Sequence, residues 1–482
     1  MGSEVRQLHV FLFPFMAHGH MLPMIDIAKL LAARGVRSTI VLTPGNACLF
    51  ENSVDRAKKA GYPIEVHLLR FSSSGTGLPE GGENFDYVSN SAETLKLINA
   101  VKNLEEPFNQ LVEEQRPDGI ISDMFLPWTV KVSDKLGIPR LVFYGTSYFS
   151  LCVGDSLRRF SPEKNVKSDT EPFLVPGLPD PIELTKSQLP SVSDTLLSGL
   201  MTEVVEADSK SYGVIQNSFY ELEPSYVEHY RKETGKKAWS VGPVSLCNAK
   251  MVEMADRETN TSSESNEALR WLDVQKPSSV LYVCFGSLCK FSPAQLAETA
   301  MALESSGCPF IWVKKKSEVL PEGFEERIKE KGFIINGWAP QILILNHLAI
   351  GGFMTHCGWN SILEGITAGL PMITWPAFAE QFYNEKFVTK VLKIGVGVGT
   401  ILWVPWEQED KPIIEREVIQ EAVRSIMVDG EEAKRMRKKA KELAAMAKMA
   451  VQKGQSSYVD LSCLIEELRM ISTQNATANL LQ

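Results

Sequence analysis

Features that would place this chain of 482 residues in a membrane or a secretory pathway are absent. No apolar run reaches the length of about 18 residues that a membrane-spanning helix needs. The apolar run at residues 8–13 is short, ends at Pro14 and follows charged residues, whereas a signal peptide has a basic start and a longer apolar centre. We therefore expect no membrane span and a cytoplasmic location.

The eight cysteines lack any spacing that indicates a structural site. No Cys-x-x-Cys pair occurs, so a zinc ribbon or a dithiol redox centre is not indicated. A disulfide framework is typical of much shorter secreted chains. We expect reduced thiols that act mostly as small buried apolar side chains, which fits a cytoplasmic protein.

A basic surface for nucleic acid is also missing. The net charge is −9, whereas binding to phosphate backbones needs clustered lysine and arginine. The most basic stretch, residues 434–448, reads as the solvated face of an amphipathic helix. The glycine pattern G-x-G-x-x-G does not follow the first predicted strand, where the chain reads F-M-A-H-G-H. This argues against a nucleotide-dependent oxidoreductase.

The first half of the chain alternates strand-like and helix-like segments. Residues 8–13 and 38–43 predict strands, and residues 22–33 between them predict a helix that ends at Arg34-Gly35. Such a unit implies a parallel sheet. The apolar runs at 119–122, 141–144 and 214–217 continue it, and residues 157–190 indicate a long loop region.

A polar stretch poor in aromatic residues, within residues 238–267, separates this half from a second alternating set. Ser292 and Gln295, with Pro293 between them, predict a capping box at the start of a helix. We expect two doubly wound α/β domains in tandem. The expected boundaries are 1–240 for the first domain, 241–267 for a linker, 268–455 for the second domain, and 456–482 for a C-terminal helix.

Residues 338–381 hold the most informative group of side chains: WAPQILILNHLAIGGFMTHCGWNSILEGITAGLPMITWPAFAEQ. Trp338 offers a flat surface, Gln341 and Glu364 offer an amide and a carboxylate, and a polar cluster lies at 356–361. This inventory suits a nucleotide sugar, with a base, a ribose diol, a diphosphate and a hexose. The cluster opens a helix directly after a strand, where free N–H groups attract an anion.

The segment resembles, almost position for position, the signature segment of plant secondary-product UDP-glycosyltransferases. It has W-A-P-Q, H-C-G-W-N-S-x-x-E, G-x-P, W-P and E-Q in one register, and G-H-M-L-P and S-D-M-F precede it in the family's order. The resemblance covers the whole chain. It implies the GT-B fold, in which two Rossmann-like domains face each other across a cleft, and it implies a UDP-sugar co-substrate and a small lipophilic acceptor. We expect a monomer.

The resemblance also assigns roles to single residues. Trp338 would stack on uracil, Ala339 would contact it through the backbone, and Gln341 and Glu364 would hold the ribose. The diphosphate would contact His356, Gly358, Asn360, Ser361 and Ser287. The sugar would contact Trp359, Glu380, Gln381 and Thr146, and glutamine at 381 indicates glucose rather than galactose. Each residue has a structural alternative: a core aromatic for Trp338, a helix cap for Glu364, a buried histidine for His356, and a turn or cap for Thr146 and Ser147.

No Asp-x-Asp motif occurs in the chain. The diphosphate would then be neutralised by a helix N-terminus and by hydrogen bonds, without Mg²⁺. We therefore expect no bound metal and no cofactor.

His20 and Asp123 form the candidate catalytic pair. Each follows a predicted strand of the first domain, so both are expected at the same edge of its sheet. A histidine oriented by a carboxylate is a general base near neutral pH. The resemblance supports this pairing, in which His20 deprotonates an acceptor hydroxyl that displaces UDP with inversion. His18 takes a family position that is often glutamine, and we assign it no chemistry.

The acceptor pocket is expected in the first half of the chain. Phe15, Phe85, Phe125 and Phe149, with Tyr87, are candidates for an apolar cleft, and core packing is the alternative for each. A phenolic or flavonoid hydroxyl is the expected acceptor, and a triterpenoid or steroid alcohol is the alternative. A nucleotide-sugar-binding protein without catalysis is a different class, which would not need the pair formed by His20 and Asp123. Nitrogen, sulfur or carbon nucleophiles would also fit the same donor segment.

Overall fold

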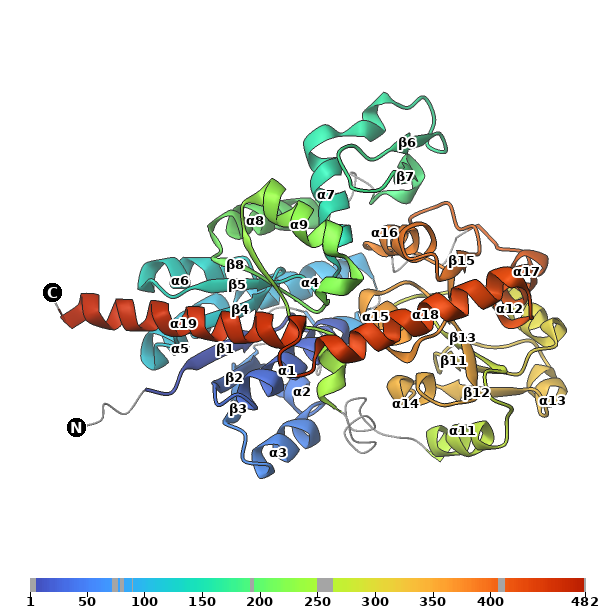
Figure 1. Ribbon diagram of the computed structural model, residues 1–482, viewed down its shortest axis with the longest axis horizontal. Helices are drawn as coiled ribbons and strands as arrows, with labels where there is room; N and C mark the ends of the chain where they lie inside the picture. Colours follow the sequence, from blue (N-terminus) through green and yellow to red (C-terminus); the bar gives the residue numbers. More distant parts are fainter. Residues whose placement is uncertain are drawn as a thin grey trace.

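The computed structural model describes residues 6–71, 77–78, 82–88, 90–190, 195–248, 263–405 and 412–480. Two α/β halves lie side by side, each built on a parallel sheet with helices around it (Figure 1). The expected fold class, two doubly wound parallel-sheet domains in tandem, is confirmed.

The first sheet has the strand order β3-β2-β1-β4-β5-β8-β9, and every neighbouring pair is parallel. Its strands are β1 (His9–Phe13), β2 (Arg37–Leu42), β3 (Ile64–Leu68), β4 (Gly119–Asp123), β5 (Arg140–Phe143), β8 (Gly213–Gln216) and β9 (Lys237–Ser240). The order reverses between β1 and β4, and ligands bind at such switch points beyond the carboxyl ends of the strands. His20 and Asp123 follow or end these two strands.

The second sheet has the order β12-β11-β10-β13-β14-β15 and is also parallel throughout. Its strands are β10 (Val280–Cys284), β11 (Phe310–Lys314), β12 (Gly332–Asn336), β13 (Ile350–Thr355), β14 (Met372–Thr374) and β15 (Gly395–Gly397). The order reverses between β10 and β13, which are the strands that lead to Ser287 and His356.

Helices cover the sheets (Figure 1). In the first half they are α1 (His18–Ala32), α2 (Pro44–Ala47), α3 (Glu51–Lys59), α4 (Ser91–Lys102), α5 (Glu105–Gln115), α6 (Thr129–Leu136), α7 (Tyr148–Phe160), α8 (Thr195–Lys210) and α9 (Pro224–Thr234). In the second they are α11 (Ser263–Asp273), α12 (Pro293–Ser306), α13 (Phe324–Ile328), α14 (Gln341–Leu345), α15 (Trp359–Ala368), α16 (Gln381–Lys386), α17 (Arg416–Met427) and α18 (Glu431–Ala450). A single turn, η1 (Phe85–Tyr87), lies before α4.

The two halves share a continuous apolar core. Phe149 of α7 packs against Phe387, with ring centroids 5.0 Å apart, and the Trp359 ring lies 6.2 Å from the same Phe387. The Trp359 Nε1–H donates to the Asn217 carbonyl at 2.8 Å, and Ser150 Oγ donates to Asn384 Oδ1 at 2.8 Å. Because these buried contacts join residues of both halves, the carboxyl ends of the two sheets are held facing each other.

The last helix, α19 (Ser456–Leu480), follows α18 and lies along the first half (Figure 1). Its apolar side chains at 461, 464, 465 and 468 are buried in the same cluster as β1 and α1. Arg34 donates to the Tyr458 carbonyl at 2.9 Å and stacks over its ring at 3.8 Å. The chain thus returns to the first half after building the second.

The start of α1 was predicted wrongly. The helix begins at His18 rather than at residue 22, so Pro23 lies inside it and His20 lies in its first turn. A proline inside a helix has no N–H to give to the carbonyl four residues earlier. That carbonyl belongs to Gly19, and it accepts instead from Asn360 Nδ2 of the second half at 2.7 Å.

Two smaller predictions also need correction. Residues 157–190 are not one loop, because α7 extends to Phe160 and an antiparallel hairpin follows, made of β6 (Pro172–Leu174) and β7 (Glu183–Thr185). Ser292 caps α12, but the Gln295 side chain bonds to the backbone of Ile414 and so does not complete a capping box. Within the predicted linker, residues Val244–Cys247 form a single turn, residues 263–267 belong to α11, and residues 249–262 lie outside the described residues, so the domain boundaries stay a prediction.

Among the helices of the described residues, none is both long and apolar enough to cross a membrane.

The packing of α19 gives a prediction about stability. Leu464 is fully buried against the first half, so Leu464→Ala should lower the free energy of unfolding by about 2–5 kcal/mol. Met470 is 59% exposed on the same helix, and Met470→Ala should change the free energy of unfolding by less than about 0.5 kcal/mol. Urea unfolding followed by tryptophan fluorescence measures both. Equal losses in the two variants would contradict this packing.

Candidate active site

One cavity of about 600 Å³ lies between the two halves and receives side chains from both. That volume is in the usual range for a small-molecule site. Most residues that the sequence singled out line it: Phe15, His20, Phe85, Tyr87, Phe125, Ser287, Trp338, Ala339, Gln341, His356, Gly358, Trp359, Asn360, Ser361, Glu364 and Glu380. Residues far apart in the chain therefore meet in one place.

The structure brings His20 and Asp123 together. His20 Nδ1 lies 2.7 Å from Asp123 Oδ2, and the carboxylate is completely buried at the end of β4. Asp123 Oδ1 also accepts from the backbone N–H of Phe125 at 3.0 Å, which fixes the carboxylate plane. With Nδ1 engaged in this way, Nε2 is the ring nitrogen that remains for a substrate.

The pKa of His20 is raised above its ordinary value of 6.5. Burial of the ring by itself lowers the pKa. The charge of Asp123 and its hydrogen bond outweigh burial, and the charges of Glu380 and Asp86 raise the pKa further. The imidazolium that forms after proton uptake is therefore stabilised by a permanent partner, as a general base requires.

An aromatic cluster surrounds His20 on the side of the first half. The rings of Phe15 and Phe125 lie 5.7 and 5.6 Å from the imidazole, and Phe15 also contacts Phe85 at 5.8 Å. All three phenylalanines line the cavity, and their role as an acceptor pocket stays a prediction. This cluster offers a flat, apolar surface beside the candidate base.

Phe149 was assigned to that pocket wrongly. Its side chain is fully buried between Tyr226 and Phe387, at 4.9 and 5.0 Å, and it does not line the cavity. The first turn of α7 points it into the core that joins the two halves. Its position just after strand β5 gave no information on which face of the helix it would take.

At the other end of the cavity, β13 leads into the N-terminus of α15. No side chain caps the start of this helix, so no capping side chain accepts a hydrogen bond from its first N–H groups. His356, Asn360 and Ser361 surround it and line the cavity. A Cβ added to Gly286 or Gly358 would lie within 2.7 Å of the His356 ring, so only glycine permits this close packing.

His356 is held neutral. Burial, followed by the charge of Lys315, lowers its pKa to about 4. Its Nδ1 is buried and has no hydrogen-bond partner among the described residues. A neutral imidazole carries one N–H, which suits donation to an anion without adding charge.

Gln341, at the start of α14, lies next to Glu364 of α15. Gln341 Nε2 donates to Glu364 Oε2 at 2.9 Å and to Ser361 Oγ at 3.3 Å. Trp338, just before α14, has 43% of its surface exposed and faces the cavity. An exposed indole next to a carboxylate and an amide is the arrangement that a nucleoside needs, and the core alternative for Trp338 does not hold.

The four residues predicted to contact a sugar do not all line the cavity. Glu380 lines the cavity, and burial raises its pKa. The Trp359 ring is 2% exposed and its N–H is taken by Asn217, so its ring belongs to the core. Gln381 and Thr146 do not line the cavity, and Gln381 Oε1 accepts from the backbone of Ala377 and Phe378 at 2.9 and 3.1 Å. Neither of these two side chains is therefore placed to contact a ligand in the cavity.

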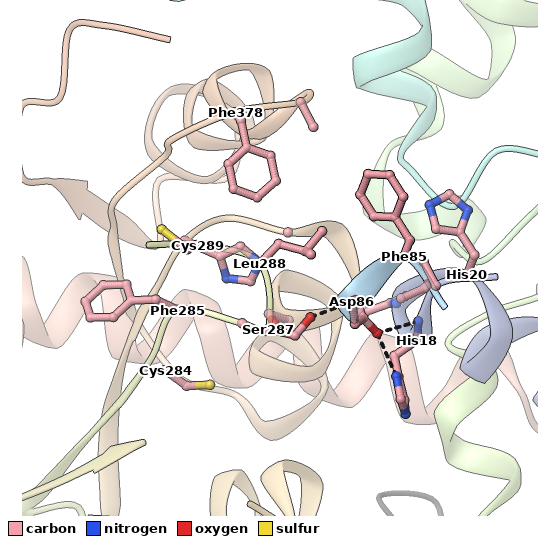
Figure 2. Close-up of a pocket in the computed structure, with 18 of the residues that line it drawn as sticks. His18, His20, Phe85, Asp86, Cys284, Phe285, Ser287, Leu288, Cys289 and Phe378 are labelled. Carbon is pink, nitrogen blue, oxygen red and sulfur yellow. Dashed lines mark hydrogen bonds and ion pairs between the residues drawn. The ribbon is translucent and has the colours of Figure 1, made fainter. Parts of the chain in front are cut away.

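His18, to which the sequence assigned no chemistry, lies beside Asp86, a residue that no sequence motif indicated. Asp86 Oδ2 lies 2.6 Å from His18 Nδ1, and Asp86 Oδ1 accepts from Ser287 Oγ of the second half at 3.1 Å (Figure 2). The His18 ring centroid lies 4.6 Å from that of Trp338. No local pattern could have shown this, because Asp86 comes from a turn that is distant from both partners in the chain.

Among the described residues, no group of three or more histidine, cysteine, aspartate or glutamate side chains is placed to hold a metal ion. The polar groups around the N-terminus of α15 include backbone N–H groups, hydroxyls, amides and a neutral histidine, and Lys315 and the Asp86 carboxylate line the cavity nearby. Taken together, the cavity can remove a proton at His20 and hold an anion at α15.

Comparison with known proteins agrees with this geometry. Residues 189–402 match the family described as UDP-glucoronosyl and UDP-glucosyl transferase. A scopoletin glucosyltransferase of Nicotiana tabacum is 50% identical over 481 residues, which covers 98% of this chain and all of that protein. A UDP-glucose flavonoid 3-O-glucosyltransferase 7 of Fragaria ananassa is 48% identical, over 97% of both chains.

A solved structure, UGT73P12 of Glycyrrhiza uralensis complexed with glycyrrhetinic acid 3-O-monoglucuronide, superposes with a TM-score of 0.92 at 42% identity and covers 98% of each chain. Another, UGT2 of Phytolacca americana complexed with UDP-2fluoro-glucose and pterostilbene, gives a TM-score of 0.76 at 27% identity and covers 97% of this chain and all of that one.

The pairing of His20 with Asp123 predicts a measurable pKa change. In Asp123→Asn the charge that raises the His20 pKa is lost and burial, which lowers it, remains. The His20 pKa should then fall, because the largest contribution that raises it is lost. Proton–nitrogen NMR titration of the imidazole measures this, with the His356 ring as an internal reference. An unchanged His20 pKa would show that Asp123 does not govern it.

Proposed function

Since this chain belongs to the family of plant UDP-glycosyltransferases, we propose that it transfers glucose from UDP-glucose to a hydroxyl of a phenolic or flavonoid compound. The observation that carries this proposal is that a histidine–aspartate pair and the free N-terminus of α15 face one cavity. A base and an anion site that share one cavity are what direct transfer to a hydroxyl needs.

The donor lies along the second half in this proposal. Uracil stacks on Trp338 beside the Ala339 backbone, and Gln341 and Glu364 bind the ribose hydroxyls. The diphosphate is held by the first N–H groups of α15 and by the side chains at His356, Asn360, Ser361 and Ser287, with Gly358 allowing the close approach. Glu380 binds hydroxyls of the glucose. Trp359, Gln381 and Thr146 support the glucose end of the cavity by packing around it. Glutamine at 381, which the family resemblance associates with glucose, and the relative named as a UDP-glucose flavonoid 3-O-glucosyltransferase support glucose.

The reaction follows from these positions. His20 Nε2 takes the proton of the acceptor hydroxyl, and Asp123 stabilises the imidazolium that results. The acceptor oxygen forms a bond to the anomeric carbon while the bond from that carbon to the diphosphate oxygen breaks. The charge that develops on UDP is stabilised by the α15 N-terminus and the hydrogen bonds around it. Attack opposite the leaving group turns an α-linked donor into a β-glucoside.

The acceptor lies along the first half, against Phe15, Phe85 and Phe125. A phenolic ring fits this aromatic surface, and the relatives named for scopoletin and flavonoid support that class. The alternative, a triterpenoid or steroid alcohol, is favoured by one observation: the superposing structure with glycyrrhetinic acid 3-O-monoglucuronide. In this proposal residues 1–240 bind the acceptor and residues 268–455 bind the donor, and the protein acts as a cytoplasmic monomer.

Product analysis tests the proposed function directly. UDP-glucose is supplied with scopoletin, a flavonol, glycyrrhetinic acid and a steroid alcohol, and products are identified by mass spectrometry. We expect a hexoside of the phenolic acceptors. A hexoside formed only with glycyrrhetinic acid or the steroid would favour the alternative class. Binding of UDP without any product would favour the binding protein without catalysis.

The role of His20 gives a kinetic prediction. His20→Ala removes the base and should lower kcat about 10²–10⁴-fold, while the dissociation constant for UDP changes little. Steady-state kinetics and calorimetry measure the two quantities. His229, outside the cavity, supplies the control, since His229→Ala should keep full activity. Full activity in His20→Ala would remove His20 from the mechanism.

The proposed donor site uses no metal, which a chelator tests. Activity should be the same within error after dialysis against EDTA, because hydrogen bonds and a helix N-terminus neutralise the diphosphate. A loss of activity that Mg²⁺ restores would contradict this part of the proposal.

A further inference from the structure

Asp86 places a carboxylate among the groups proposed to bind the donor diphosphate. It belongs to the turn η1 of the first half, and its side chain is only 8% exposed. Three contacts hold it: Oδ2 accepts from the His18 backbone N–H at 3.0 Å and lies 2.6 Å from His18 Nδ1, and Oδ1 accepts from Ser287 Oγ at 3.1 Å (Figure 2). The carboxylate therefore reaches across the cavity to the second half.

This carboxylate is negatively charged at neutral pH. Burial alone raises its pKa, but the hydrogen bonds and the charge of His18, together with the Ser287 hydroxyl, outweigh burial and leave the pKa lowered. A phosphate bound at Ser287 is also an anion. Two anions that approach the same buried group repel each other with little screening by water.

Competition for a hydrogen adds to this repulsion. A serine hydroxyl has one hydrogen to donate, and neither an ionised carboxylate nor a phosphate oxygen has one to give in return. Ser287 can donate either to Asp86 or to a phosphate, and not to both at once. Each binding of the diphosphate at Ser287 must then take that hydrogen away from Asp86.

The exchange needs no movement of the η1 turn. When Ser287 turns to a phosphate, Asp86 Oδ2 keeps both of its contacts with His18, whose side chain is itself 7% exposed. Only the contact across the cavity is lost. The carboxylate stays in place, ready to take the hydroxyl back when the diphosphate departs.

We propose that Asp86 determines the affinity of the donor site, by competing with the diphosphate for the Ser287 hydroxyl and thereby promoting the release of UDP. The inference rests on the proposed function, because it takes Ser287 to be a ligand of the diphosphate. His18 acts as a positioning residue, since it holds the Asp86 carboxylate in reach of Ser287.

Calorimetry with UDP, UMP and uridine tests the proposal on wild type and Asp86→Asn. Asparagine has the same shape, and its carbonyl oxygen still accepts from His18, but it carries no charge. UDP should bind about tenfold more tightly to the variant, because an uncharged amide competes less for the Ser287 hydrogen than a carboxylate does, and hydrogen bonds to charged groups are the stronger ones. Stopped-flow measurement should show correspondingly slower dissociation of UDP. Uridine, which has no phosphate, should bind both proteins equally.

Two further variants separate the causes. In Ser287→Ala the contested hydroxyl is gone, so adding Asp86→Asn should bring only a small part of the tenfold gain. Glu83→Gln removes a charge from the same segment, where Glu83 accepts from the Gly45 N–H and does not line the cavity, and it should leave UDP affinity unchanged. Asp86→Ala, checked for folding by circular dichroism, gives a second removal of the charge and should also tighten UDP binding.

The outcomes distinguish this inference from the proposed function. If wild type does not bind UDP, the proposed function fails. If wild type binds UDP but Asp86→Asn and Asp86→Ala, both folded, bind it equally or more weakly, the competition at Ser287 is refuted and the proposed function stands. A full tenfold gain in the Ser287→Ala background would also refute it, because the hydroxyl would then play no part.

Discussion

The buried hydrogen bond from the Trp359 indole to the Asn217 carbonyl, within an apolar core that spans both halves, is the contact on which the site depends. Each sheet alone would present its carboxyl edge to water. Because Phe149, Trp359 and Phe387 pack together across the boundary, the two edges face each other and enclose one cavity. α19 reinforces this arrangement, because it follows α18 of the second half and buries its apolar face on the first.

The enclosed cavity divides the chemistry between its two walls. The first half supplies His20, whose proton affinity is set by a buried carboxylate, and an aromatic surface beside it. The second half supplies a helix N-terminus and a histidine that burial keeps neutral. The Gly19 carbonyl, which Pro23 leaves without a helical partner, accepts from Asn360 and ties the turn of the base to the anion site. Small shifts between the halves would therefore disturb base and anion site together.

Much of this could be read from the sequence, and the failures have physical causes. The alternation of strands and helices predicted both sheets, and the segment at 338–381 predicted which residues gather at the second one. Phe149 was misplaced because a position just after a strand does not say which way the next helix turns its side chains. The helix predicted from residue 22 begins at His18, so Pro23 lies in its second turn, and the Gly19 carbonyl that this proline leaves free accepts from Asn360. Asp86 was invisible because its partners, His18 and Ser287, are brought to it only by the packing of the two halves.

The central claim is that a hydroxyl activated by His20 displaces the diphosphate in a single step from the opposite face of the sugar. The anomeric configuration of the first glucoside formed, read by proton NMR early in the reaction, tests this most directly. The account predicts a β-glucoside from the α-linked donor, with no α-anomer at the earliest times. An α-glucoside as the first product would contradict the single displacement and the role of the cavity that the two sheets enclose.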